Sequence, residues 1–196
     1  MVLVGLDEAG VGPAFGSVWA AAVHMPQPLE GLADSKKITE KRRDALRSRL
    51  DERETPHGLG EVTANEIDTL GLGEARRLVF ERALEDLCTR FPHIVPTELI
   101  VDGTIFRSWR DIPYQCIPKA DDTVPCVSAA SIYAKTTRDR QVEAWCDEDE
   151  TLQLNYGIRS NKGYLSQVHI SGIRTHGRTA RHRHSYRIRS LENDGK

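Results

Sequence analysis

The sequence predicts an α/β protein in which a small sheet is flanked by helices. Short apolar runs of strand length, such as residues 2–6 and 99–101, end directly in acidic residues. Residues 72–87, between these runs, carry their apolar side chains at helical spacing instead. In open sheets joined by helical crossovers, ligands bind outside the strand ends. The strand ends are therefore where functional residues are expected.

The first apolar run ends in the adjacent acids Asp7 and Glu8. Two carboxylates at the end of a buried strand are costly unless a partner compensates their charge, and a divalent cation is the simplest such partner. The turn that follows contains the glycines Gly10, Gly12 and Gly16. Glycines allow a turn to be tight and to present backbone N–H groups to an anion or a hydroxyl. The alternative is a solvated turn that only ends the strand.

Residues 17–24 are apolar and follow the glycine turn, so we expect a second strand that pairs with the first, although the three alanines also suit a helix. Thr39 is the expected N-cap of a helix whose inner face carries Leu46 and Leu50. Just before it, residues 34–37 offer a hydroxyl and two ammonium groups. These groups suit either phosphate contacts or an ordinary charged surface.

Capping and periodicity predict the remaining elements. Thr63 and Glu66 form a capping box for a short helix that ends at Gly71, and a longer helix follows from Leu72. Further strands are expected at residues 59–62, 99–101 and 114–118, and further helices at residues 128–145 and 165–176.

Three separate segments deliver acids at the ends of apolar runs, through Asp7 with Glu8, through Asp102 and through Asp121. If these carboxylates converge they repel one another unless cations neutralise them, and two divalent ions bridged by carboxylates catalyse phosphoryl chemistry. The alternative is a set of unrelated surface turns. The acidic residues 147–150 are expected to be a solvated loop, because four consecutive side chains cannot converge on one ion.

The net charge of −2 hides a segregation of charge. Residues 157–190 contain no Asp or Glu, whereas they contain the cations Arg159, Lys162, Arg174, Arg178, Arg181, Arg183, Arg187 and Arg189. Such a segment suits phosphate contacts, or else forms a solvated basic face. Within it, the loop of residues 160–164 combines Lys162 with Tyr164, which suits binding a phosphate and stacking on a sugar or base.

Length and composition exclude several classes. The 196 residues suit one medium-sized domain, and no apolar run is long enough to span a membrane or to act as a secretory signal. We therefore expect a cytoplasmic protein. The four cysteines form no C-x-x-C pair, which favours reduced thiols over a disulfide framework or a zinc site.

Six segments, in this order, resemble the type 2 ribonuclease H (ribonuclease HII) family. They are residues 6–13, 34–37, 101–103, 119–121 together with 127–135, 160–164 and 182–186. The resemblance implies an RNase H-like fold, with a mixed five-stranded sheet flanked by helices. It further implies a catalytic domain at residues 1–150 and a C-terminal basic helical segment at residues 151–196, which contributes to the substrate groove within the same compact unit.

The resemblance also implies an endonuclease that cleaves the RNA strand of RNA/DNA hybrids and cuts at ribonucleotides embedded in duplex DNA. Its metal ligands would be Asp7, Glu8, Asp102 and Asp121, holding two Mg²⁺ or Mn²⁺ ions. One ion would activate the attacking water and the other would stabilise the leaving 3′-oxygen, giving 5′-phosphate and 3′-hydroxyl ends. Asp122 does not align with a ligand. No membrane partner is implied, and we expect a monomer.

By the same resemblance, Tyr164 would pack on a deoxyribose beside the cleaved linkage. Backbone groups of Gly10, Val11 and Gly12 would read the 2′-hydroxyl that distinguishes RNA from DNA. Phosphates would be held by Ser35, Lys36 and Lys162.

Two positions depart from the family pattern. Val11 stands where the family usually has Arg, so a side-chain contact to the nucleic acid is lost and the protein is expected to act mainly on longer hybrids. Asn161 stands where the family more often has His, and a small effect is expected. Two other functions remain open: a catalytically weak or inactive hybrid-binding protein of the same fold, and another nuclease such as a junction resolvase, which the loop of residues 162–164 disfavours.

Overall fold

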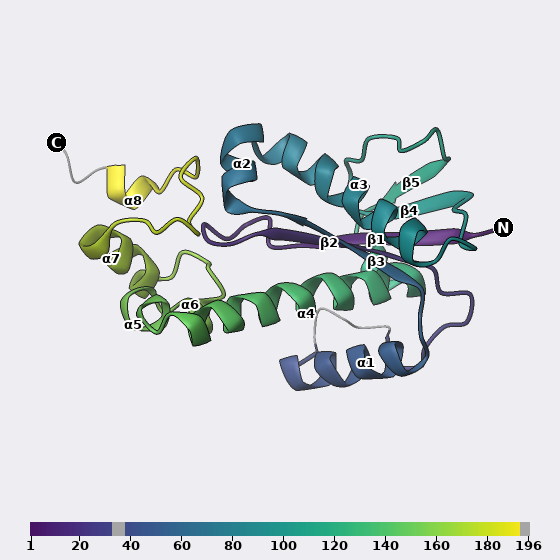
Figure 1. The fold of residues 1–196 in the computed structure, drawn as a ribbon, viewed down its shortest axis with the longest axis horizontal. Coiled ribbons are helices and arrows are strands. Elements are labelled where there is room, and N and C mark those ends of the chain that lie inside the picture. The colour runs from purple at the N-terminus through teal and green to yellow at the C-terminus, as the bar shows by residue number, and fades with distance from the viewer. Residues whose placement is uncertain (33–37, 193–196) are drawn as a thin grey trace.

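The computed structural model describes residues 1–32 and 38–192. Residues 34–37, with the predicted phosphate contacts Ser35 and Lys36, lie outside this part of the chain. Five strands form one sheet in the order β3-β2-β1-β4-β5 (Figure 1). Their bounds are β1 (Leu3–Ala9), β2 (Val18–Val23), β3 (His57–Val62), β4 (Glu98–Asp102) and β5 (Tyr114–Ile117). β1 pairs antiparallel with β2 and parallel with β4, which confirms the mixed five-stranded sheet.

The alanine-rich segment forms the strand β2 and not a helix. Ala20 and Ala22 are fully buried on one face of the sheet, and Ala21 is fully buried on the other. Small side chains on both faces let helices pack close to the sheet from both sides. β2 is therefore an interior strand of the sheet. Its alanines are explained by the close packing of helices on both faces and not by helix propensity.

Two long helices cover the two faces of the sheet (Figure 1). α3 (Leu72–Arg90) packs on β3 and β2, and α4 (Pro125–Glu148) packs on β1 and β2 from the opposite side. α1 (Glu40–Glu52) lies outside α4, with Leu46 and Leu50 buried as predicted. The short helix α2 (Ala64–Leu70) opens with the predicted capping box.

The C-terminal part of the chain folds back onto the turn after β1. α5 (Thr151–Tyr156), α6 (Ile158–Asn161), α7 (Gln167–His176) and α8 (Arg189–Glu192) gather around the far end of α4 (Figure 1). An isolated bridge joins Phe15 to His182, and the backbone N–H of Arg183 donates to the carbonyl of Ala14 at 2.8 Å. The last segment of the fold is thereby attached to the first turn. In the described part of the chain, no helix has the length and apolar character needed to cross a membrane.

Packing of α3 on β3 depends on glycine. A Cβ atom at Gly60 would lie 2.1 Å from the backbone oxygen of Val79, whereas one at Gly73, near the start of α3, would meet nothing within 4 Å. We expect Gly60→Ala to lower the free energy of unfolding by about 2 kcal/mol or more, because α3 has to move away from the sheet. Gly73→Ala should instead stabilise the protein by up to about 1 kcal/mol. Urea unfolding of the two variants checks this pair, and equal stabilities would contradict the close packing.

Candidate active site

The four predicted acids line one cavity of about 470 Å³. Asp7 and Glu8 come from β1, and Asp102 is the last residue of β4. Because Leu6 on β1 is paired in parallel with Val101 on β4, the acids that follow them emerge side by side at the same sheet edge. Asp121 belongs to the short 3₁₀ helix η2 (Ala120–Asp122). Acids far apart in the sequence are thus brought together.

The side chain of Asp102 links β4 to η2. Its Oδ1 accepts a hydrogen bond from the backbone N–H of Ala120 at 2.8 Å, and Lys119 precedes this helix with a positive φ of 60°. The hydroxyl of Ser128, near the start of α4, donates to the backbone carbonyl of Asp121. Asp121 is therefore held from both sides, with only 1% of its surface exposed.

The fold disfavours the charged form of Asp7. Burial raises the pKa of Asp7 well above its usual value, and the neighbouring charges of Glu8 and Asp102 raise it further. Hydrogen bonds from the Ser131 side chain and from the backbone N–H of Glu8, the latter at 2.8 Å, act in the opposite direction. A cation bound in the cavity would relieve both the burial cost and the repulsion.

Glu8 has a partner that the sequence did not predict. Its Oε1 forms an ion pair with the guanidinium of Arg76 on α3, while its Oε2 is buried and has no hydrogen-bond partner among the described residues. Burial raises the pKa of Glu8; the charge of Arg76 lowers it, and the charge of Asp102 raises it. The only hint in the sequence is that Arg76 adjoins the buried Ala75 at the margin of the apolar face of α3.

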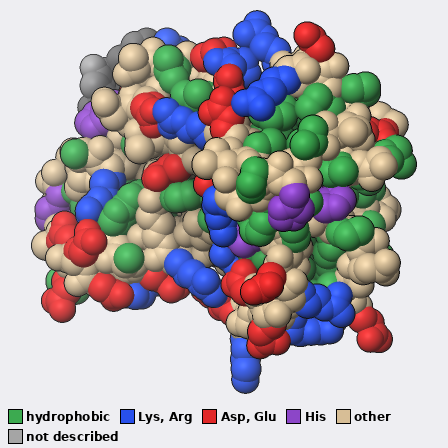
Figure 2. All heavy atoms as spheres, turned by 45° about the vertical axis from the view of Figure 1, so that its right-hand side comes forward, with side chains coloured by type: hydrophobic (Ala, Val, Ile, Leu, Met, Phe, Trp, Pro, Cys, Tyr) green, Lys and Arg blue, Asp and Glu red, His purple; other side chains and the backbone are tan. Residues whose placement is uncertain are grey.

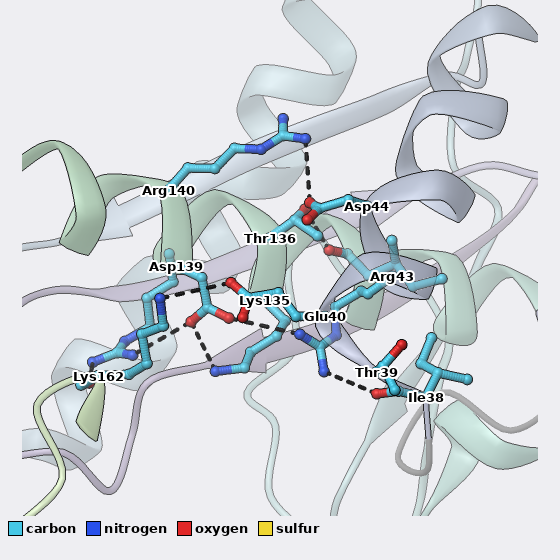
Figure 3. Close-up of polar contacts among 12 residues, drawn as sticks. Ile38, Thr39, Glu40, Arg43, Asp44, Lys135, Thr136, Asp139, Arg140 and Lys162 are labelled. Carbon is cyan, nitrogen blue, oxygen red and sulfur yellow. Dashed lines mark hydrogen bonds and ion pairs between the residues drawn. The ribbon is translucent and has the colours of Figure 1, made fainter. Parts of the chain in front are cut away.

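Two further cations line the cavity, Arg43 from α1 and Lys135 from α4. Both face Asp139, with Lys135 Nζ at 2.8 Å from Oδ1 and Arg43 Nη1 at 3.7 Å from Oδ2 (Figure 3). The Asp139 side chain is only 8% exposed. A signal for this face does exist, because Ser131, Lys135 and Asp139 recur every four residues and therefore share one face of the helix.

The predicted nucleic-acid contacts are placed in different ways. Gly10, Val11, Gly12 and Tyr164 all line the cavity. Lys162 is not among the residues that line it. Its Nζ lies 2.6 Å from Glu143 and 3.7 Å from Glu40, between α4 and α1 (Figure 3).

Asn161 holds the backbone of the loop that carries Tyr164. Its amide donates to the carbonyl of Tyr156 at 2.8 Å and to the hydroxyl of Ser166 at 3.2 Å, and its Oδ1 accepts from the N–H of Gly163 at 2.8 Å. The small effect expected for this departure from the family pattern stays a prediction, but the contacts give Asn161 a structural role.

The basic segment does not form a continuous basic surface. Arg159 pairs with Asp147 at 2.5 Å, Arg181 pairs with Glu148 at 2.9 Å, and Arg183 is fully buried. On the face shown in Figure 2, basic and acidic side chains are interspersed. Asp147 and Glu148 thus neutralise part of the positive charge of residues 157–190.

The donor set fits divalent cations. Four carboxylates supply the hard oxygen ligands that Mg²⁺ and Mn²⁺ prefer. As the side chains lie, no three acids, histidines or cysteines within residues 1–32 and 38–192 are gathered closely enough to hold an ion, and Glu8 is engaged by Arg76. The buried, unpartnered Oε2 of Glu8 and the repulsion felt by Asp7 are nevertheless what a cation in this cavity would relieve.

We expect Asp7→Asn to raise the melting temperature at neutral pH in buffer containing EDTA. The fold raises the pKa of Asp7, so its ionised form destabilises the folded state above that pKa, and the cost vanishes below the unfolded value of about 3.9. The difference from the wild type should therefore shrink as the pH falls. Each kcal/mol relieved corresponds to about 2–4 °C.

Thermal unfolding followed by circular dichroism at several pH values measures this difference. Asp122→Asn, at an exposed position of η2, is the control and should leave the melting temperature unchanged. A melting temperature for Asp7→Asn at or below that of the wild type at neutral pH would contradict the assigned cost.

Comparison with known proteins identifies relatives over nearly the whole chain. The family model described as Ribonuclease HII matches residues 4–189. Ribonuclease HII of Paracidovorax citrulli (strain AAC00-1) is 40% identical over 187 residues, which cover 94% of this chain and 74% of the relative. Ribonuclease HII of Polaromonas sp. (strain JS666 / ATCC BAA-500) is 39% identical, covering 94% of this chain and 89% of the relative.

Solved structures share the fold. RNase HII in a PCNA:RNase HII complex from Archaeoglobus fulgidus superposes with a TM-score of 0.73 at 22% identity, covering 96% of each chain. Ribonuclease H2 from Pyrococcus horikoshii OT3 gives 0.69 at 23% identity, covering 95% of this chain and 94% of that one. Bst-RNase HIII in complex with Mn²⁺ gives 0.68 at 23%, covering 90% and 63%. With the matching family model and the relatives at about 40% identity, these similarities show that the chain belongs to the ribonuclease HII family, a family of RNase H nucleases.

Proposed function

We propose that this member of the ribonuclease HII family is a divalent-metal-dependent endonuclease that cleaves the RNA strand of RNA/DNA hybrids and leaves 5′-phosphate and 3′-hydroxyl ends. The observation that carries the proposal is the convergence of Asp7, Glu8, Asp102 and Asp121 on one cavity. Carboxylates so arranged serve two-metal hydrolysis of phosphodiesters.

In this proposal the four acids hold two divalent cations. When bound, these ions supply an activated water and neutralise charge on the leaving oxygen. The protein supplies the geometry: Ala120 orients Asp102, Ser128 fixes the backbone of Asp121, and Ser131 hydrogen-bonds to Asp7. The Mn²⁺ complex of the structurally similar Bst-RNase HIII supports a requirement for a divalent ion.

The turn after β1 and the ring of Tyr164 would distinguish ribose from deoxyribose. A Cβ atom at Gly12 would lie 3.4 Å from Cε1 of Tyr164, so turn and ring adjoin each other at the cavity. A Cβ atom at Gly10 would lie 2.2 Å from Nε of Arg138, and the φ of Gly10 is 91°. Only glycine suits this position. The half-exposed Tyr164 ring is free to pack on a sugar while backbone N–H groups bind a 2′-hydroxyl.

Phosphates of the substrate would be bound by Ser35, Lys36 and Lys162, as the family resemblance implies. For Lys162, release from Glu143 and Glu40 would accompany that contact. The structure offers Arg43 and Lys135 as additional cations directly at the cavity.

Substitution of one acid tests the proposal. We expect Asp102→Asn and Asp121→Asn to reduce cleavage of an RNA/DNA hybrid in Mg²⁺ or Mn²⁺ by at least about 100-fold, because a metal site contributes several kcal/mol to transition-state stabilisation. Binding of the hybrid should remain. Asp122→Asn, one residue away and exposed, should cleave at the wild-type rate. A folded wild-type protein that binds the hybrid without cutting it would support the inactive binding protein instead.

A second prediction concerns the length of the RNA segment. Val11 is half-buried and packs against the core, so the turn has no cationic side chain to offer the nucleic acid. We expect a duplex with several consecutive ribonucleotides to be cut about tenfold faster, or more, than one with a single ribonucleotide, since a missing charge-assisted contact is worth about 1.5–3 kcal/mol. Cleavage mapping on the two duplexes measures this ratio, and equal rates would show that the backbone alone suffices.

A further inference from the structure

The fully buried guanidinium of Arg183 donates hydrogen bonds to backbone carbonyl groups of the turn that follows β1. Arg183, from the C-terminal segment, donates from Nη2 to Gly10 at 2.5 Å, from Nη1 to Val11 at 2.9 Å and from Nε to Gly16 at 2.8 Å. Its exposed fraction is 0%. All three nitrogen atoms of this side chain are thereby committed to the turn.

The hydroxyl of Tyr186 completes this contact. It donates to the carbonyl of Val11 at 2.6 Å and accepts from Nη1 of Arg183 at 2.9 Å. The carbonyl of Val11 thus has two donors that also bind each other. Such a closed set of hydrogen bonds resists rotation of the peptide group more than a single bond would.

The segment that carries these two residues is itself anchored. Asp68, in α2, accepts from the backbone N–H groups of His184 and Ser185, each at 2.8 Å, and from the hydroxyl of Ser185 at 2.6 Å. The guanidinium of Arg178 holds the carbonyl of Tyr186 at 2.7 Å. Arg183 and Tyr186 therefore approach the turn from a fixed position.

Fixing the carbonyls also fixes the N–H groups of the same peptides. A peptide group is planar and trans, so the C=O of Gly10 and the N–H of Val11 point in opposite directions, as do the C=O of Val11 and the N–H of Gly12. With both carbonyls bound to Arg183, both N–H groups are directed away from it. A rotated peptide would leave a donor of the buried cation unpaired, which is unfavourable.

We propose that Arg183 and Tyr186 are positioning residues that set the preference of the site for ribonucleotides, by fixing the peptide groups of Gly10–Gly12. The inference rests on the proposed function, in which these peptides read the 2′-hydroxyl. Because Val11 has no side-chain donor, backbone orientation is what this turn can contribute to recognition. Neither residue touches the reacting atoms; both act through the turn.

Tyr186→Phe is the sharpest test, because it removes one hydroxyl and retains the ring. Affinity is measured for a duplex with ribonucleotides and for the all-DNA duplex of the same sequence, with Asp102→Asn in every protein to prevent cleavage. We expect the ratio of the two affinities to fall about three- to tenfold, the size of one hydrogen bond. Affinity for the all-DNA duplex should not change.

Tyr133→Phe is the matched control. Its hydroxyl donates to Asp51 at 3.0 Å, and Tyr133 does not line the cavity. It should leave the affinity ratio at the wild-type value. Arg183→Lys, which retains the charge but loses the fork of donors, should lower the ratio further than Tyr186→Phe; an Arg183→Lys protein that does not fold leaves the decision to Tyr186→Phe.

Two outcomes would overturn the assignment: a ratio unchanged by Tyr186→Phe, or an equal loss of affinity for both duplexes, which would indicate a general structural role. A starting protein with Tyr186 intact that does not distinguish the two duplexes would instead refute the ribose-reading role of the turn, and this inference with it. The proposed function itself fails if the wild-type protein does not cleave the hybrid, so each failure is seen in a different protein.

Discussion

Carboxylates at one edge of the sheet repel one another, and the other residues of the site are arranged to offset this repulsion. β1 carries two consecutive acids just before its last residue, and its parallel neighbour β4 ends in a third at the same level. Hydrophobic packing of α3 and α4 fixes the strands, so the acids cannot separate. The charge must be balanced where it stands, by hydrogen bonds, by nearby cations and by metal ions.

The balancing cations around the cavity are themselves held by acids. Arg76 binds Glu8, while Arg43 and Lys135 share Asp139. Alternating signs of this kind let the fold keep cations beside a group of carboxylates without neutralising the group permanently. In the proposed function, these cations would also give an incoming polyanion several positions at which a phosphate replaces a protein carboxylate.

Local patterns in the sequence suffice for much of the fold and for the acids of the site. The Thr63 capping box, the buried Leu46 and Leu50 and the acids at strand ends are all properties of neighbouring residues, and the structure contains each of them. The sequence of residues 18–23 suits a strand or a helix. Its alanines are required because helices pack on both faces of this strand, and a local sequence pattern carries no information on that packing.

Contacts between distant segments could not be predicted in this way. Arg76 meets Glu8 across 68 positions, and Arg183 meets Gly10 across 173. The basic segment illustrates the same limit: its composition predicts an electropositive surface, yet Arg183 is buried and Arg159 and Arg181 are paired with acids. Which cation remains available to a phosphate depends on tertiary pairing and not on the number of cations.

The attachment of the last segment to the first turn has a consequence for biosynthesis. A ribosome releases the N-terminal strand well before residues 183–186, because the segments lie 173 positions apart and synthesis proceeds at roughly 5–20 residues per second. Since Arg183 and Tyr186 bind the carbonyls of Gly10 and Val11, the emerging polypeptide cannot give this turn its final shape until residues 183–186 have been synthesised. Nascent chains that lack residues 183–186 would therefore have an unfinished turn, the part of the site proposed to read the ribose, while they lie close to messenger RNA.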